Sequence, residues 1–216
     1  MFTRFAAVSN YKTNAEQVGW SWVFTGSQWE HVQGANWLHP SGVTSDINGL
    51  EQNPVVHVSW NDAKTYCAWA GRHLPSEAQW EKAARGPDGR IYPWGNQPLA
   101  GNLLNFADSS LIWDWADKSI NDGYQFTAPV DSYPDGKSYY GVLDMAGNVW
   151  EWVTDWYNAT YYTNSPDRNP QELTPVTYRV LRGGSWIDDA SLVRSAVRYF
   201  YYPDYHNDIF GFRCAR

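Results

Sequence analysis

The chain has 216 residues, of which 43% are hydrophobic and 18% are charged, so it can build a sizeable core and does not have the composition of a disordered protein. Its net charge of -7 and its lack of any Lys/Arg cluster argue against nucleic acid as the main ligand. No apolar run approaches the roughly 18 residues of a membrane span, and no signal peptide is visible.

The beginning of the chain predicts short helices followed by a strand. Residues 2–8 form a helix candidate, and a helical turn at 14–17 follows Thr13 as a possible cap. The aromatic and β-branched run at 18–24 predicts a strand. Residues 34–50 are rich in Gly, Pro, Ser, Asn and Asp, which indicates an ordered loop.

Two further helices are predicted from their capping signals. Ser59 and Asp62 have the spacing of a capping box, and so do Ser76 and Gln79. The sequence that follows each box is short, uncharged on one side, and ends next to a glycine. We therefore expect both helices to lie against a sheet.

Regular patterns fade after Arg90. Residues 54–58, ahead of the first capping box, and 127–132 are predicted to form short strands. Residues 102–122 form a long loop rich in polar and aromatic side chains, and such loops in a compact domain are usually functional or held by a ligand. No internal repeat or linker is present, so we expect a single domain over residues 1–216.

The last stretch of the chain alternates two kinds of segment. Residues 182–186, 194–196 with Arg198, and 211–213 form what we call the frame, in which paired glycines permit unusual backbone and repeated arginines can hold loops in place. Between them lie clusters rich in Tyr, Asp, Asn and His, a composition like that of antibody loops. The alternative is an aromatic core segment, because Tyr and Phe are also good strand residues.

The remaining residue types give few chemical signals. Cys67 and Cys214 are either a long-range disulfide or two buried thiols. The histidines show no metal-binding spacing and are expected to be mostly structural, although His206 falls within the proposed variable surface. No Ser-His-Asp set, phosphate loop or close acid pair stands out.

A series of motifs in chain order resembles the formylglycine-generating, or sulfatase-modifying-factor, domain. The resemblance implies an α+β fold, an irregular variant of the C-type lectin fold with little regular secondary structure. The first strand and Met-Gly turn of that family have no counterpart before Phe2, so we expect one sheet edge to be affected. The motifs are GANWLHP (34–40), NPVVHVSW (53–60), AWAGRHLPSEAQWEKAARG (68–86), YPWGN (92–96), TAPVDSYP (127–134), GVLDMAGNVWEW (141–152), LRGGSW (181–186) and GFRCA (211–215).

The same resemblance implies that this chain lacks the family's catalytic thiols. Members that oxidise a sulfatase cysteine carry one cysteine three residues after the serine of the Gly-Gly-Ser motif and another five residues further on. Counted from Ser185, those positions are Asp188 and Val193 here. A copper-thiolate site needs soft sulfur ligands, which neither residue supplies. We therefore expect no copper and no formylglycine production, and we expect Ser185 to be structural.

Other site residues are implied by the resemblance. Cys67 and Cys214 match the structural disulfide of the family. A calcium loop corresponds to Asp144, Gly147, Val149 and Glu151, and a second, weaker calcium site to Asn105 or Asn102 with the next carbonyl, Asp122 and the carbonyl of Tyr124. Carboxylates and carbonyls are the hard oxygen ligands that Ca²⁺ prefers. The alternative is that Asp144 and Glu151 cap turns and pair with arginines.

The C-terminal stretch is similar to the variable proteins of diversity-generating retroelements, which randomise adenines, mostly in AAC codons. Such codons cannot yield Trp, Met, Gln, Lys or Glu, and none of these occurs from residue 187 to 210. The expected variable region is about 182–213. The predicted variable, ligand-binding positions are Ile187, Asp188, Asp189, Leu192, Val197, Tyr199, Phe200, Tyr201, Tyr202, Tyr205, His206, Asn207, Asp208, Ile209 and Phe210.

The sequence therefore predicts a non-enzymatic display protein that binds a protein or glycan target, on a virion or cell surface, through Tyr and Phe anchors. A first alternative is an enzyme, or degenerate enzyme, of the sulfatase-modifying family with altered chemistry. A second is a structural or assembly module without a variable role. Fold alone does not decide between these functions.

Overall fold

The computed structural model describes residues 1–216. It is an α+β structure with little regular secondary structure, since 49 of its 79 backbone hydrogen bonds lie in turns, loops and caps. None of its helices has the length and apolar composition needed to cross a membrane. The helices are α1 (Phe2–Ser9), α2 (Asn14–Val18), α3 (Trp60–Trp69) and α4 (Glu77–Arg85), and the strands are β1 (Trp20–Phe24), β2 (Trp29–Gln33), β3 (Trp150–Trp156), β4 (Arg179–Arg182), β5 (Arg198–Tyr201) and β6 (Phe210–Phe212).

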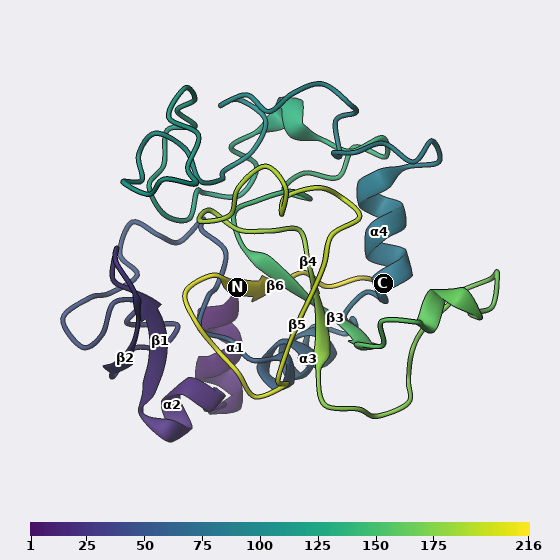
Figure 1. Cartoon of the computed structure of the whole chain (residues 1–216). Helices are drawn as coiled ribbons and strands as arrows, with labels where there is room; N and C mark the ends of the chain where they lie inside the picture. Colours follow the sequence, from purple (N-terminus) through teal and green to yellow (C-terminus); the bar gives the residue numbers. More distant parts are fainter.

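A four-stranded sheet in the order β5-β4-β3-β6 lies at the centre, and β1 and β2 form a separate antiparallel hairpin (Figure 1). Strand β3 is antiparallel to β4 and parallel to β6, with Trp150 opposite Phe210. Strand β4 pairs antiparallel with β5. The C-terminal stretch thus provides both edge strands of this sheet, and residues 202–209 cross from one edge to the other.

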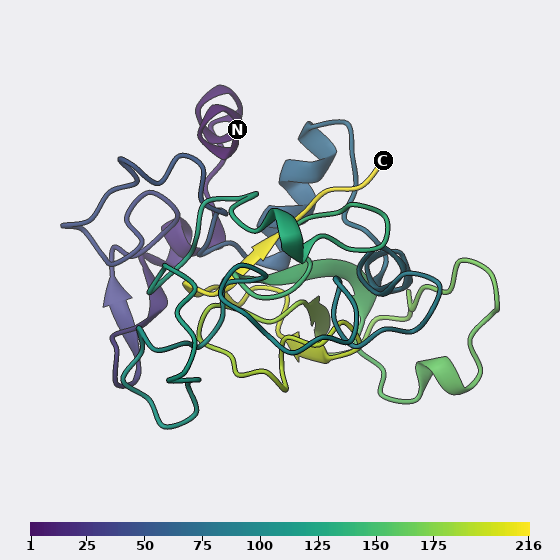
Figure 2. The same ribbon diagram turned by 90° about the horizontal axis from the view of Figure 1, so that it is seen from above.

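Long loops surround this small sheet. The segment between α4 and β3 gathers at one end of the sheet, at the top of Figure 1. Seen from above, the β1–β2 hairpin stands on one side of the sheet and the segment between β3 and β4 projects on the other (Figure 2). The hairpin is also a neighbour of the C-terminal segment, because Trp22 forms a β-bridge with Asn207, although the two lie at opposite ends of the sequence.

The predicted helix starts are confirmed. Thr13 caps α2, and both predicted capping boxes are present at the starts of α3 and α4. In the first box the Ser59 hydroxyl accepts the Asp62 amide at 3.1 Å, while the Asp62 carboxylate accepts the Ser59 amide at 2.8 Å. Each box satisfies N–H groups that a helix start leaves without partners. Both helices pack against β3, as expected.

The strands predicted at residues 54–58 and 127–132 are absent, and these two predictions are wrong. His57 has a φ of 58°, and its amide donates to the carbonyl of Asn207 at 2.7 Å. Asp131 has a φ of 65°, and its amide donates to a carboxylate at 2.9 Å. Left-handed backbone interrupts a strand, so long-range hydrogen bonds outweigh the β-propensity of the apolar runs.

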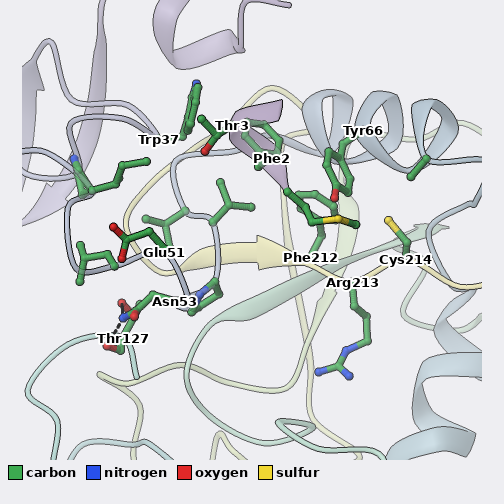
Figure 3. Close-up of a pocket in the computed structure, with 18 of the residues that line it drawn as sticks. Phe2, Thr3, Trp37, Glu51, Asn53, Tyr66, Thr127, Phe212, Arg213 and Cys214 are labelled. Carbon is green, nitrogen blue, oxygen red and sulfur yellow. Dashed lines mark hydrogen bonds between the residues drawn. The ribbon is translucent and has the colours of Figure 1, made fainter. Parts of the chain in front are cut away.

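Helix α3 is bonded to the end of the chain, and helix α1 packs against both. Cys67 of α3 and Cys214 form a disulfide, with their Cα atoms 5.6 Å apart. The Phe2 ring stacks on Tyr66 at 5.4 Å and meets Phe212 edge-on at 6.4 Å, measured between ring centroids. Figure 3 shows these rings gathered beside the Cys214 sulfur at the edge of a pocket of about 390 Å³. Aromatic packing therefore reinforces the covalent link.

Arg182, the last residue of β4, has a fully buried side chain. Its guanidinium donates to the backbone carbonyls of Ser195 and Val197 and to the Glu81 carboxylate of α4. One side chain of the frame therefore fixes the loop that precedes β5, which is the role that the recurring arginines predict.

Glu77, at the start of α4, is the second acidic partner of this cluster. Its carboxylate accepts two hydrogen bonds from Arg198, at 2.7 and 2.8 Å. One of its oxygens lies 3.7 Å from Nε of Arg182. Glu77 itself is 1% exposed, so Arg198 pairs with a buried carboxylate that also lies near Arg182.

We expect Glu77→Gln to lower the free energy of unfolding by about 3 kcal/mol, because it leaves buried positive charge without compensation. Urea denaturation monitored by tryptophan fluorescence measures this loss. The matched control is Lys12→Gln, which removes a pair with Glu16 whose lysine is 72% exposed and should change stability by less than about 1 kcal/mol. Equal losses in the two variants would contradict the role given to Glu77.

Candidate ligand-binding site

A pocket of about 820 Å³ lies between the β1–β2 hairpin and the C-terminal segment. We call it the hairpin pocket. Its walls come from β1, β2, the start of β3, the loop before β3 and the C-terminal stretch. Four tryptophans line it, namely Trp22, Trp29, Trp115 and Trp150. This volume lies within the range of small-ligand sites, and the aromatic lining offers large rigid contact areas.

Strand β5 turns alternate side chains toward the hairpin pocket. Tyr199 and Tyr201 line it, as expected for residues two apart on one strand. The Tyr199 ring stacks on Trp150 with centroids 5.1 Å apart, and the Tyr201 ring lies 3.8 Å from Tyr205. These neighbours hold the tyrosines in place while leaving part of each ring accessible.

Phe200, between the two tyrosines, and Tyr202, just after β5, lie on the other face of the sheet. Phe200 stacks on Tyr157 with centroids 4.0 Å apart. The Tyr202 hydroxyl lies 3.3 Å from that of Tyr178. Neither residue lines the hairpin pocket. The aromatic side chains of this stretch are therefore divided between two faces of the sheet by the alternation of the strand.

Most of the predicted variable positions line the hairpin pocket, and the others do not. The positions that line it are Ile187, Asp188, Asp189, Leu192, Tyr199, Tyr201, Tyr205, Asn207, Ile209 and Phe210. Those that do not are Val197, Phe200, Tyr202, His206 and Asp208.

Several of these positions are too buried to form an accessible surface. The side chains of Ile187, Asn207, Ile209 and Phe210 are buried, and Phe210 is 1% exposed. They form the floor of the pocket and the core beneath it. His206, another predicted variable position, is buried as well.

Asp188 and Asp189 are the only charged side chains that line the pocket. Asp188 accepts hydrogen bonds from the amide and the hydroxyl of Ser185, at 2.9 and 2.5 Å. Asp189 accepts the amide and the hydroxyl of Ser191, at 2.7 and 2.6 Å. Burial raises the pKa of Asp188 to about 6 despite the hydrogen bonds from Ser185. The pocket is therefore acidic and aromatic.

Asp188 and Val193, the two positions at which the resemblance implies cysteines in active members, have different surroundings. Asp188 is held by Ser185 at the pocket wall, whereas Val193 is fully buried in an apolar cluster with Leu104 and Phe106. Gly184 has a φ of 79°, and a Cβ atom there would lie 2.8 Å from a Val193 methyl group. Val193 is thus a packing residue that the paired glycines of the frame accommodate.

A buried chain of hydrogen bonds joins β1 to the C-terminal segment. Nδ1 of His206 lies 2.9 Å from the Ser21 hydroxyl, which lies 2.8 Å from Nδ1 of His57. Nε2 of His57 lies 2.9 Å from the carbonyl of Pro40, so it carries the proton and Nδ1 accepts from Ser21. His206 then donates to Ser21, and both imidazoles are neutral. Burial lowers the pKa of His57 to about 3 and that of His206 to about 4.

The first predicted calcium loop is brought together in a pocket of about 410 Å³ that contains Asp144, Gly147, Val149 and Glu151. Arg213 donates hydrogen bonds to two of these residues. It donates to both oxygens of Glu151, at 2.5 and 2.6 Å, and to the backbone carbonyl of Asp144 at 2.7 Å. Glu151 is thus paired with an arginine, whereas the Asp144 carboxylate accepts the amide of Asp131 at 2.9 Å.

The second predicted calcium site has a different character. Asn105 is 1% exposed, and its side-chain oxygen has no hydrogen-bond partner. Asp122 lies beside it, because its carboxylate accepts the amide of Phe106 at 2.9 Å. Burial raises the pKa of Asp122 to about 6. An unpartnered amide oxygen next to a buried carboxylate fits a hard cation, whereas Asn102 pairs with Asp135 instead.

The tryptophans of the pocket were missed in the sequence because they lie far from the C-terminal stretch. Trp22 and Trp29 belong to the hairpin, and nothing local marks them as binding residues. Trp115 had an indirect signal, since it lies in the long loop predicted to be functional. Its indole N–H donates to the carbonyl of Ile187 at 3.0 Å and so connects that loop to the variable region.

The Sulfatase-modifying factor enzyme 1-like domain family matches residues 1–216. A formylglycine-generating enzyme of Streptomyces coelicolor is 42% identical over 99% of this chain and 74% of its own length. Inactive C-alpha-formylglycine-generating enzyme 2 of Bos taurus is 39% identical over 99% and 72%. Among solved structures, PvdO of Pseudomonas aeruginosa has a TM-score of 0.73 at 25% identity, covering 99% of this chain and 74% of that one. Treponema denticola variable protein 1 has a TM-score of 0.63 at 20% identity, covering 88% of each.

The neutral histidines predict how acid affects stability. Unfolded histidine binds a proton near pH 6.5, whereas His57 and His206 do so only near pH 3 to 4 in the folded protein. The stability that the two neutral histidines contribute is therefore complete above pH 6.5, and it is lost as the pH falls from 6.5 toward 3. We expect His57→Asn, which suits the positive φ, to reduce the stability lost between pH 6.5 and 4.5 by about 2 kcal/mol.

Urea denaturation at several pH values measures how steeply the free energy of unfolding falls between pH 6.5 and 4.5, which we call the slope. Exposed His73 supplies the control, because His73→Asn should leave the slope as in the parent protein. An unchanged slope in His57→Asn would show that the histidines of the buried hydrogen-bond chain do not titrate as described.

Proposed function

We propose that this chain, which belongs to the family of Sulfatase-modifying factor enzyme 1-like domains, is a ligand-binding display protein of a diversity-generating retroelement and not a catalyst. Its fold is the α+β, C-type lectin fold of the formylglycine-generating-enzyme type, shared with the solved neighbours. The proposed ligand is a protein or glycan target, and the proposed place of display is a virion or cell surface.

The observation that carries the proposal is the hairpin pocket. Predicted variable positions from three clusters of the C-terminal stretch meet in one acidic, aromatic hollow, although the sequence separates them by frame residues. Two frame arginines fix the intervening segment: Arg182 donates to the backbone carbonyl of Ser195, and Arg198 pairs with Glu77 of α4. Side chains at the accessible positions can therefore change without removing the contacts that fix the backbone.

The surroundings of the family's cysteine positions favour the absence of formylglycine chemistry. Val193 is fully buried among apolar side chains, and Asp188 is bonded to Ser185. Neither position offers a thiolate for a copper ion. The alternative of an enzyme with altered chemistry is favoured by one observation, the 42% identity to a formylglycine-generating enzyme.

Sequencing the encoding locus tests the display role. We expect an adenine-rich near-copy of the 3′ region and a reverse transcriptase gene nearby, because adenine-directed diversification needs both. Codons for the accessible pocket positions Asp189, Leu192, Tyr199 and Tyr201 should be of the NNC type opposite AAC in the copy. Frame codons, such as those for Arg182 and Arg198, should be identical in the two copies. Ordinary mixed codons and no near-copy would contradict the display role.

A formylglycine assay separates the proposal from the enzyme alternative. We expect no aldehyde after incubating the protein with copper and a sulfatase-motif peptide, and mass spectrometry of the peptide measures this. The Streptomyces coelicolor relative serves as the positive control. Turnover by this chain would establish the enzyme alternative and overturn the non-catalytic role.

We also propose a structural calcium ion at the second site, held by Asn105, the carbonyl of Phe106, Asp122 and the carbonyl of Tyr124. The unpartnered oxygen of buried Asn105 supports this assignment. Bound calcium would neutralise the Asp122 carboxylate and connect the start and end of the long loop. That loop carries Trp115 at the rim of the hairpin pocket.

Calcium at 100 times its Kd should raise the free energy of unfolding by about 2.7 kcal/mol, since only the folded chain assembles the site. Thermal melts with calcium and with a chelator measure the shift. Asp122→Asn should remove it, and Asp144→Asn, in the loop occupied by Arg213, should keep it. A shift that disappears in Asp144→Asn and persists in Asp122→Asn would assign the ion to the other loop.

A further inference from the structure

A second large pocket, of about 750 Å³, is reached from the same C-terminal backbone as the hairpin pocket. We call it the aromatic pocket. Asp208 lines it, whereas its neighbours Asn207 and Ile209 line the hairpin pocket. In the same way Trp186 lines the aromatic pocket and Ile187 the hairpin pocket. Successive residues thus line different pockets. Asp208, a predicted variable position, lines the aromatic pocket, to which the proposed function assigns no role.

The walls of this pocket are mainly aromatic. Phe24 lies 5.1 Å from Trp113 and 6.3 Å from Trp186, and Phe126 meets Trp186 edge-on at 5.2 Å, measured between ring centroids. Phe24 and Trp186 are buried at 8% and 2% exposure, and Phe126 is 53% exposed. The pocket therefore has a fixed aromatic floor and an accessible aromatic rim.

Asp208 is the only charged side chain among the residues that line this pocket. One of its carboxylate oxygens accepts the amide of Phe24 at 2.9 Å. The other oxygen is buried and has no hydrogen-bond partner. A buried carboxylate without a cationic neighbour is costly, and native proteins rarely leave one unless it meets a ligand or changes its protonation.

We propose that the aromatic pocket binds a small organic ammonium ion, with Asp208 as its counter-ion and the rings of Phe24, Trp113 and Phe126 around its apolar body. Aromatic faces attract organic cations, and a single acidic group in an apolar pocket fixes their orientation. A calcium or magnesium ion does not fit, because those ions need several oxygen ligands and the pocket supplies one carboxylate between apolar walls.

This site is separate from the hairpin pocket, although Phe24 lines both pockets. It needs the carboxylate of Asp208 and the aromatic walls, four of which come from outside the C-terminal stretch: Phe24, Trp113, Tyr124 and Phe126. An ammonium ligand would be held whether or not the hairpin pocket is occupied.

The test compares two probes of nearly equal shape, 4-phenylbutylamine and 4-phenylbutan-1-ol, by calorimetric titration of the full chain at pH 8. The amine should bind at least tenfold more tightly than the alcohol, because only the amine carries the charge that Asp208 complements. Asp208→Asn keeps an acceptor for the Phe24 amide and should lower the amine affinity about tenfold, to the level of the alcohol. Asp189→Asn is the matched control in the hairpin pocket and should leave both affinities unchanged.

A second variant and a pH series keep the test decisive if Asp208→Asn folds poorly. Phe126→Ala changes an exposed ring and should weaken both probes. Burial raises the pKa of Asp208 to about 7, and Tyr124 is the only other titratable side chain lining the pocket. Amine affinity should therefore rise from pH 6 to pH 8 in the parent protein and stay flat in Asp208→Asn.

Several outcomes would overturn the proposal. They are equal affinities for the amine and the alcohol, no binding of either, an amine affinity that survives both Asp208→Asn and Phe126→Ala, or an affinity lost in Asp189→Asn instead.

Discussion

The buried guanidinium of Arg182 is the constraint on which the C-terminal half of the structure depends. Its side chain is fully buried, and its partners come from α4 and from the loop ahead of β5. A buried cation without such partners costs several kcal/mol, so these elements must be in place together. Arg198 repeats the arrangement one strand away through Glu77. Charge, more than regular secondary structure, thus determines the path of this segment.

That arrangement is compatible with a rigid backbone that carries the side chains predicted to vary. The arginines bond the backbone from the side of α4, and β5 and β6 are held at the two edges of the sheet. Neighbouring positions such as Asn207 and Asp208 line different pockets. The same short stretch therefore supplies a floor to one pocket and a counter-ion to another.

Local signals predicted what local physics controls. The boxes at Ser59 and Ser76 were readable because a cap involves only residues three apart. The strand predicted at 54–58 failed because the His57 amide is taken by Asn207, 150 positions further along the chain. The tryptophans of the hairpin pocket were not predicted for a related reason. Trp22 and Trp29 become binding-site residues only when the hairpin meets the C-terminal segment.

The sequence by itself determined the family, the α+β fold and the helix starts, and it predicted a region of variable positions, since motifs and caps are local and ordered along the chain. Only the tertiary structure decided which of those positions are accessible. Tyr199 reaches a pocket and Phe200 does not because of strand alternation, and His206 is internal because Ser21 and His57 enclose it. Burial and cross-chain hydrogen bonds join residues that no spacing in the sequence connects.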